Sequence, residues 1–312
     1  MGFFEARIRR ASVAWSLVAL LSAGCGSGDD ATDSESGGTT SAQTTTTATG
    51  AGGQGHTSTS STTSTSTTSG AGGAGAGGGD GGAPPQGLTS LGALVVLGDS
   101  ISDGGGQSPF YYDMLKNDLG SKYGNIAYHN KAQSGSKTGA LVGQIDDLPG
   151  TLPGPVAVVI TSGGNDMKAA LLQIVTGTDG PAKAQMEANV AAALDTLTTP
   201  GRFGAGVEVH VFEGNIYDAS DGKGDFGSHG CAFGQGMPTI ATDPFFDAWN
   251  GVIATEIAGH GQVAADMHAH FYGHGYAGSP DWFASDCTHP NALGHDQLRR
   301  LFYSKITGEM LP

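Results

Sequence analysis

Five short segments rich in β-forming residues recur after residue 90. Their sequences are ALVVLG at 93–98, NIAYHN at 125–130, PVAVVIT at 155–161, VEVHVFEG at 207–214 and QVAADMHAHF at 262–271. Residues 93–97 and 156–160 are apolar without interruption, which is typical of central parallel strands that are covered on both faces. We therefore predict five strands, two of which lie in the middle of a sheet.

Apolar residues at helical spacing accompany these segments. One set follows Pro181, a second follows Pro244, and a third follows Pro290 and Asn291. The sets are Met186, Val190, Ala193, Leu194 and Leu197; Phe245, Trp249, Val252, Ile253 and Ile257; and Leu298, Leu301, Phe302 and Ile306. Proline suits the first turn of a helix. The alternation of strands and helices predicts one three-layer α/β/α domain around a parallel sheet, with ligand sites outside the carboxyl ends of the strands.

The first 25 residues are typical of an export signal. Three arginines within the first ten residues precede an apolar run over 11–23, which is too short to span a membrane comfortably. The five residues that end at Cys25, Leu-Ser-Ala-Gly-Cys, resemble the lipobox of bacterial lipoproteins. That resemblance implies cleavage before Cys25, lipidation of its thiol and stable membrane anchoring. The alternative is an ordinary signal peptide in which this cysteine is incidental.

Residues 26–87 are almost entirely Gly, Ser, Thr and Ala, and we expect them to form a disordered tether. Such a segment lacks the apolar surface that offsets the entropy of folding. About 60 residues of this kind have an r.m.s. span of about 40 Å. The sequence thus predicts a folded domain over 88–312. We expect a lipid anchor to hold this domain at the outer membrane of the cell envelope, and the alternative is that the protein is secreted.

The charge balance argues against a nucleic-acid partner. The chain has a net charge of −15, and beyond residue 90 it carries 11 Lys and Arg against 23 Asp and Glu. Binding to phosphates needs clustered basic side chains. An acidic surface is explained more simply by solubility outside the cell.

Two cysteines, Cys231 and Cys287, lie in the predicted folded domain. Disulfides persist in exported proteins, so we predict a bridge that ties the segment after Gly230 to the segment that holds Asp286 and His289. Two free thiols are the alternative, because sequence spacing does not fix the geometry that a disulfide requires.

Candidate chemistry begins at the carboxyl end of the first predicted strand, where Asp99 and Ser100 follow Gly98. A serine nucleophile needs a base, and that base needs an orienting partner. Asp286 and His289, just before the last predicted helix, supply both, since the carboxylate can accept from one ring nitrogen while the other faces the serine. Each group alone also fits a helix cap, and the Asp-His pair also fits a metal site.

Donors for a tetrahedral oxyanion can come from two other strand ends. Asn165, in TSGGNDMK, can present its side-chain amide, and Gly135, in AQSGSKT, can present a backbone N–H. A slip of one residue would move the second donor to Ser134 or Ser136. Nearby Asp166, like Asp99, is expected to hydrogen-bond backbone groups or to serve as a turn residue.

Four sequence blocks resemble those of the SGNH hydrolases, also called GDSL esterases and lipases. In chain order they are 98–102 (GDSIS), Gly135, 164–166 (GND) and 286–289 (DCTH), and the resemblance extends over about 93–306. Ile101 replaces the leucine of the family's motif. The resemblance implies a flavodoxin-like sheet of five parallel strands.

The resemblance also implies a serine esterase mechanism without a cofactor. Ser100 is then the nucleophile, His289 the general base and Asp286 the group that orients the base. The oxyanion hole consists of the N–H groups of Ser100 and Gly135 and the side chain of Asn165. The substrate is a carboxylic ester, and the low aromatic content of 7% favours short acyl groups, such as acetyl esters of carbohydrates.

Alternative interpretations concern other classes of protein. A non-catalytic glycan-binding domain could retain the same fold, although it has no need for a complete set of catalytic side chains. His268, His270 and His274 suggest zinc, since alternation places the first two on one strand face, but no second cluster with metal spacing follows. We therefore expect no metal. Two glycine-rich segments, 103–115 and 221–238, are candidates for loops that face the substrate.

Overall fold

The computed structural model describes residues 87–236 and 238–311. The predicted export signal with Cys25 and the tether up to residue 86 lie outside the described residues. Five strands form one parallel sheet in the order β2-β1-β3-β4-β5. They are β1 (Ala93–Gly98), β2 (Ala127–Asn130), β3 (Val156–Thr161), β4 (Val209–Gly214) and β5 (Val263–Ala265). The five predicted strands are therefore present, and the first and third lie inside the sheet.

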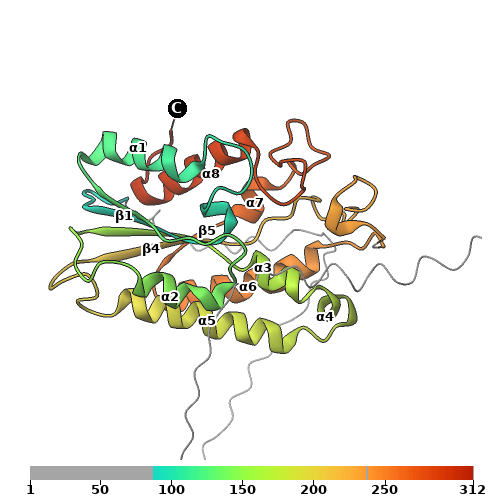
Figure 1. The fold of residues 1–312 in the computed structure, drawn as a ribbon, viewed down its shortest axis with the longest axis horizontal. Coiled ribbons are helices and arrows are strands. Elements are labelled where there is room, and N and C mark those ends of the chain that lie inside the picture. The colour runs from blue at the N-terminus through green and yellow to red at the C-terminus, as the bar shows by residue number, and fades with distance from the viewer. Residues whose placement is uncertain (1–86, 237, 312) are drawn as a thin grey trace, which may run out of the picture. The chain divides into compact units, whose positions relative to one another are not determined.

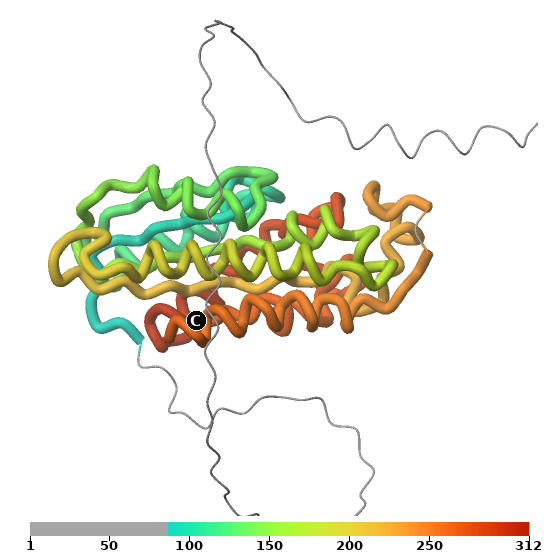
Figure 2. The backbone as a smooth tube through the Cα atoms, turned by 90° about the horizontal axis from the view of Figure 1, so that it is seen from below, coloured from blue at the N-terminus to red at the C-terminus, as the bar shows by residue number. Residues whose placement is uncertain are grey.

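Helices cover both faces of this sheet (Figure 1). The helices are α1 (Tyr111–Tyr123), α2 (Leu141–Asp146), α3 (Gly164–Ala169), α4 (Leu171–Thr176), α5 (Gly180–Thr198), α6 (Asp243–Gly259), α7 (Met267–Phe271) and α8 (Ala292–Thr307). Short 3₁₀ turns are η1 (Ser100–Ser102), η2 (Thr138–Ala140) and η3 (Ala232–Gly234). Helices α1, α7 and α8 lie on one face, and the long helices α5 and α6 run beside each other on the opposite face (Figures 1 and 2). This arrangement confirms the predicted three-layer α/β/α fold.

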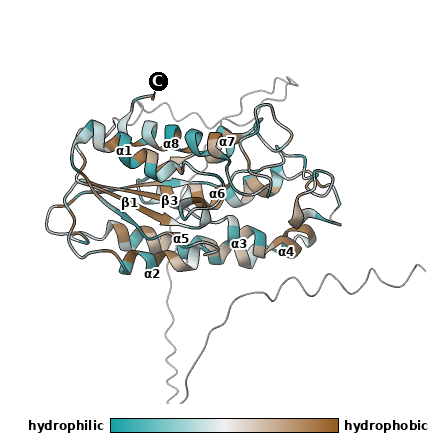
Figure 3. Ribbon diagram, turned by 45° about the horizontal axis from the view of Figure 1, so that its top comes forward, coloured by the Kyte–Doolittle hydropathy of each residue, from teal (hydrophilic) through white to brown (hydrophobic). Residues whose placement is uncertain are grey.

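The core sits in two layers, one on each side of the central strands. Every residue of β1 and β3 is buried, which is why their sequences are apolar throughout. Val95 and Leu97 face the layer formed by α2, α5 and α6, whereas Leu94 and Val96 face α1 and α8. Figure 3 shows the apolar strands between helices that carry both hydrophilic and hydrophobic residues.

The strand order places a ligand site between β1 and β3. The chain passes from β1 to β2 on one side and then returns to place β3 on the other side of β1. At such a switch point the crevice outside the carboxyl ends of the two strands is open to a ligand. Gly98 and Thr161 pair at the ends of these strands, so the residues that follow each strand emerge next to this crevice.

The predicted helices after Pro181 and Pro244 and at the end of the chain correspond to α5, α6 and α8. The expectation of one long strand over 262–271 is wrong beyond Ala265, because Asp266 caps a helix there. Its side chain accepts a hydrogen bond from the N–H of Ala269 at the start of α7. In the part of the chain that the structure describes, no helix is long and apolar enough to cross a membrane.

Candidate active site

Ser100 is the first residue of η1, at the end of β1. Gly98 makes the turn possible, because its φ is +123° and a Cβ there would lie 1.9 Å from the carbonyl oxygen of Thr161. The side chain of Gln144 accepts from the N–H of Gly98 at 2.8 Å and donates to its carbonyl at 2.9 Å. Asp99 caps η1 by accepting from the N–H of Ile101 at 3.0 Å. The backbone that carries Ser100 is therefore held from several directions.

Ser100, His289 and Asp286 form a continuous hydrogen-bonded chain. The hydroxyl Oγ of Ser100 lies 2.7 Å from Nε2 of His289. Nδ1 of the same imidazole lies 2.6 Å from Oδ2 of Asp286, while Oδ1 accepts from the backbone N–H groups of Thr288 and His289 at 3.0 Å. The three side chains come from opposite ends of the described chain, and the fold brings them together.

The carboxyl groups of Asp286 and Asp99, which both lie close to His289, have different electrostatic environments. Partial burial raises the pKa of Asp286, but hydrogen bonds from the backbone and ring of His289 and from Thr288 outweigh that effect, so its pKa lies below the usual range. Burial raises the pKa of Asp99 to about 7, although the N–H of Ile101 and the charge of His289 act in the opposite direction. Asp286 is thus an anion at neutral pH, whereas Asp99 is near its midpoint.

Asn165 lies at the start of α3, directly after β3. Its Nδ2 donates to the carbonyl of Ser136 at 2.9 Å, which leaves the second amide hydrogen for another acceptor. The neighbouring Asp166 accepts from the N–H of Thr138 at 2.9 Å and from its hydroxyl at 2.8 Å. Asp166 thereby ties α3 to the segment that includes Gly135, in agreement with the expectation that it bonds backbone.

Backbone N–H groups of Ser100 and Gly135 are the other predicted donors. The N–H of Ser134 donates to Asp103 at 2.8 Å, and the N–H of Ser136 donates to the carbonyl of Gln133 at 3.1 Å. Within the described residues the N–H of Gly135 has no acceptor, and its φ of +79° suits glycine. The N–H of Ser100, at the first position of η1, has no partner within that turn. Of the three candidates 134–136, Gly135 is therefore the one with a free donor.

A pocket of about 190 Å³ opens beside Ser100 and His289. Asn165 also lines this pocket, whereas Gly135 and Asp286 do not. The remaining lining is mostly apolar and comes from α4, from the residues after β4 and from the start of α6. The predicted substrate-facing segment 221–238 contributes several lining residues.

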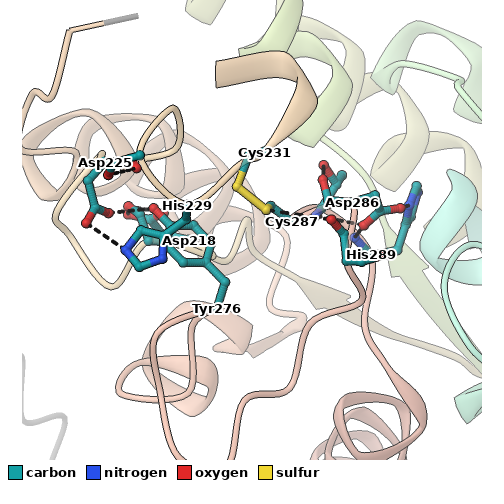
Figure 4. The surroundings of a disulfide bond; sticks show 12 residues. Asp218, Asp225, His229, Cys231, Tyr276, Asp286, Cys287 and His289 are labelled. Carbon is teal, nitrogen blue, oxygen red and sulfur yellow. Dashed lines mark hydrogen bonds and ion pairs between the residues drawn. A yellow bond between two sulfur atoms is a disulfide. The ribbon is translucent and has the colours of Figure 1, made fainter. Parts of the chain in front are cut away.

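The predicted disulfide between Cys231 and Cys287 is present and joins the pocket wall to the Asp286 segment (Figure 4). Cys287 follows Asp286 directly and has a φ of +57°, which is uncommon for a residue other than glycine. On the other side of the bridge, Asp225 accepts from the hydroxyl of Tyr276 at 2.6 Å and lies 3.1 Å from Nε2 of His229. The disulfide therefore links two segments that have their own polar anchors.

Sequence reasoning missed two residues that support the imidazole of His289. Gly105 packs against that ring, and a Cβ at this position would lie 2.5 Å from Cδ2 of His289. His295, in the first turn of α8, donates from Nε2 to the carbonyl of Gly105 at 3.0 Å, and burial lowers its pKa to about 4. The three consecutive glycines 104–106 were a signal of close backbone approach.

The other glycine-rich candidate, 103–115, is not a pocket loop. None of its residues lines the pocket, because α1 begins at Tyr111 and buries Tyr111 and Leu115 in the core. Residues 103–110 instead connect η1 to α1 and include Gly105 at the back of the His289 ring.

The histidines that suggested zinc do not share a face. His268 and His270 lie two residues apart on α7 rather than on a strand, and side chains at that spacing on a helix diverge. The ring of His268 stacks on Phe246 at 5.5 Å, and the ring of His270 lies 5.5 Å from Trp282. Across residues 87–236 and 238–311, no group of three His, Cys, Asp or Glu side chains is arranged to hold a metal ion.

A serine hydroxyl paired with an imidazole and a carboxylate is the arrangement that hydrolases with an acyl-enzyme intermediate use on several unrelated folds. Residues 96–297, more than half of the chain, match the GDSL-like lipase/acylhydrolase family. The chain belongs to this family, as the four sequence blocks predicted, and it is a carboxylic ester hydrolase.

Solved structures of similar fold include an esterase and a lipase. A catalytic mutant of an acetylxylan esterase from Geobacillus stearothermophilus is 19% identical, with 72% of this chain and 98% of that chain covered and a TM-score of 0.51. A lipase from a goat rumen metagenome is 17% identical, with 69% and 97% covered and a TM-score of 0.50. At these identities the likeness establishes the fold alone. No curated protein matches the chain in sequence.

Proposed function

We propose that the protein hydrolyses carboxylic esters by an acyl-enzyme mechanism, with Ser100 as nucleophile, His289 as general base and Asp286 as the orienting carboxylate. The observation that carries this proposal is the hydrogen-bonded chain from Ser100 Oγ through both ring nitrogens of His289 to Asp286. The lowered pKa of Asp286 supports its role, because an anion there favours the imidazolium that forms during the reaction.

In the first half of the reaction, Oγ of Ser100 forms a bond to the ester carbonyl carbon while Nε2 of His289 takes the hydroxyl proton. The tetrahedral intermediate collapses, the bond to the alcohol oxygen breaks, and His289 returns the proton to the leaving alcohol. Water then attacks the acyl-enzyme with the same base, which releases the carboxylic acid and regenerates Ser100.

The oxyanion of each intermediate is proposed to accept from the N–H of Ser100, the N–H of Gly135 and the side chain of Asn165. Two observations support this set: the N–H of Gly135 has no other acceptor among the described residues, and Asn165 retains one amide hydrogen. Preorganised donors of this kind stabilise the charge that develops in the transition state.

We also propose that the hydrolase domain is anchored to a membrane of the cell envelope through a lipid on Cys25 and the tether that follows. The support comes from the sequence of the first 87 residues. The disulfide between Cys231 and Cys287 is consistent with an oxidising compartment. A non-catalytic glycan-binding role is not favoured, because the family match is to acylhydrolases. In addition, Ser100 is hydrogen-bonded to His289, which is hydrogen-bonded to Asp286.

The test is hydrolysis of p-nitrophenyl esters by the full chain in mild detergent, with Ser100→Ala beside Ser121→Ala. Ser121 is an exposed serine on α1 and serves as the matched control. We expect Ser100→Ala to lose activity by about 10⁴-fold or more and the control to retain it. A fluorophosphonate probe should phosphonylate Oγ of Ser100 with loss of fluoride, so the peptide that contains Ser100 should gain the mass of the probe less that of HF. Hydrolysis that persists in Ser100→Ala, or that is abolished by a chelator, would contradict the mechanism.

A further inference from the structure

We infer that the pocket beside Ser100 takes the acyl chain of a medium-chain ester, of about six to ten carbons, rather than an acetyl group. This inference rests on the proposed function, because it assigns an occupant to the same site. It replaces the preference for short acyl groups that the aromatic content suggested. The chemistry of the pocket wall carries the argument.

One wall of the pocket is α4. Leu171 and Val175 line the pocket, and Ile174 lines it from a position that is only 4% exposed. Between them, Leu172 points outward and is 75% exposed. The helix therefore presents one apolar side to the pocket, and a neighbouring leucine on the same helix does not take part.

Another part of the pocket wall comes from the segments after β4 and from the start of α6. Ile216, Phe226, Phe245 and Phe246 line the pocket there. The rings of Phe226 and Phe233 lie 4.8 Å apart and close this side. Ser100, Asn165 and His289, which belong to the proposed reaction centre, supply part of the polar lining. Other polar residues also line the pocket, namely Asp99, Ser162, Lys168, Asn215, Asp218, Thr242 and Thr288, so the apolar contribution comes mainly from α4 and from these isoleucine and phenylalanine side chains.

The apolar part of the lining favours a medium-chain acyl group over an acetyl group. An apolar cavity of about 150 Å³ accommodates benzene, so a pocket of about 190 Å³ has room for a chain of more than six carbons. An acetyl group would leave this apolar wall in contact with water. Each methylene that enters such a wall increases kcat/KM by about fourfold until the pocket is full.

The experiment compares p-nitrophenyl acetate, butyrate, hexanoate, octanoate and dodecanoate, below their aggregation limits, with the full chain and two variants. Leu171→Trp places an indole in the proposed acyl site. Leu172→Trp places the same side chain on the solvent side of the same helix and is the matched control.

We expect kcat/KM of the unmodified protein to rise at least 100-fold from acetate to octanoate. Leu171→Trp should lower the ratio of octanoate to acetate activity at least tenfold, and Leu172→Trp should leave that ratio within about twofold. The chain-length profile of the unmodified protein tests the inference even if Leu171→Trp does not fold.

Two outcomes would overturn the inference. One is a flat or falling profile from acetate to octanoate in the unmodified protein, and the other is an equal effect of Leu171→Trp on both esters. If acetate is hydrolysed in a manner that depends on Ser100 while octanoate is no better, the acyl-chain inference fails and the proposed mechanism stands. If Ser100→Ala retains activity, or no ester is hydrolysed by folded protein, the proposed mechanism itself fails and the inference falls with it.

Discussion

Glu213 gives the sharpest prediction about stability, because it is a buried acid without a hydrogen-bond partner. It lies near the end of β4, is 1% exposed, and neither of its carboxyl oxygens has a partner among the described residues. It occupies the same face of the strand as Val211, which packs in the layer of α2, α5 and α6. Burial raises its pKa from 4.5 to about 8.

The size of the effect follows from this difference in pKa. Between pH 4.5 and about pH 8 the unfolded chain has lost the proton of Glu213 while the folded protein retains it. The unfolded state then binds fewer protons than the folded state, so stability falls as pH rises, by about 1.4 kcal/mol per pH unit. From pH 5 to pH 7 the loss is about 2.5 kcal/mol. Glu213→Gln removes this loss, because an amide of nearly the same shape does not titrate.

The assay is urea unfolding of the full chain at pH 5, 6, 7 and 8.5, followed by tryptophan fluorescence, to which the buried Trp249 and Trp282 contribute. We expect the unfolding free energy of Glu213→Gln, relative to the unmodified protein, to rise by about 2.5 kcal/mol from pH 5 to pH 7 and to level off above pH 8. Asp99 also has a raised pKa but is common to both proteins, so its contribution cancels.

Glu208→Gln is the matched control, because Glu208 directly precedes the same strand and its side chain is 75% exposed. Its difference from the unmodified protein should stay within about 0.5 kcal/mol at every pH. A difference for Glu213→Gln that stays constant from pH 5 to pH 7 would refute the reasoning, since it would mean that Glu213 is already ionised in the folded protein.

Three further predictions concern the reaction centre. Asn165→Ala should lower kcat by about 10²- to 10³-fold with a smaller change in KM, measured with p-nitrophenyl esters, and an effect confined to KM would contradict its oxyanion role. Gly105→Ala should lower kcat/KM by about tenfold or more, because the new methyl group must displace His289; unchanged activity would show that the ring can shift without cost. Replacing both Cys231 and Cys287 by serine removes a cross-link between residues 56 positions apart, and it should lower the unfolding free energy by about 4 kcal/mol. Urea unfolding measures this change, and a loss below about 1 kcal/mol would show that the disulfide contributes little to stability.

The sheet and the reaction centre were largely predictable from the sequence, for a physical reason. Strands buried on both faces must be apolar, so β1 and β3 stand out, and the residues after each strand must then gather at one edge of a parallel sheet. Ser100 and Asn165 therefore converge on one pocket, as their positions after β1 and β3 suggested, and His289 reaches the same pocket from the segment before α8.

Two kinds of feature could not be predicted in this way. The segment 262–271 fits alternation as well as helical spacing, and the cap formed by Asp266 decides in favour of α7 after Ala265. The acyl pocket depends on tertiary packing of α4 against segments more than 40 residues away, and the packing of Gly105 on His289 joins residues even farther apart. Neither contact has a local signature in the sequence beyond apolar residues and glycines.

The separation of Ser100 and His289 has a consequence for how the activity arises during synthesis. These residues are 189 positions apart, and His289 lies just before α8, which packs against α1. At about 5 to 20 residues per second, a ribosome synthesises His289 about 10 to 40 seconds after Ser100. We expect a nascent chain that ends before residue 286 to carry Ser100 without activation. Ester hydrolysis is therefore among the last properties that the growing chain acquires, and a chain truncated there is inactive.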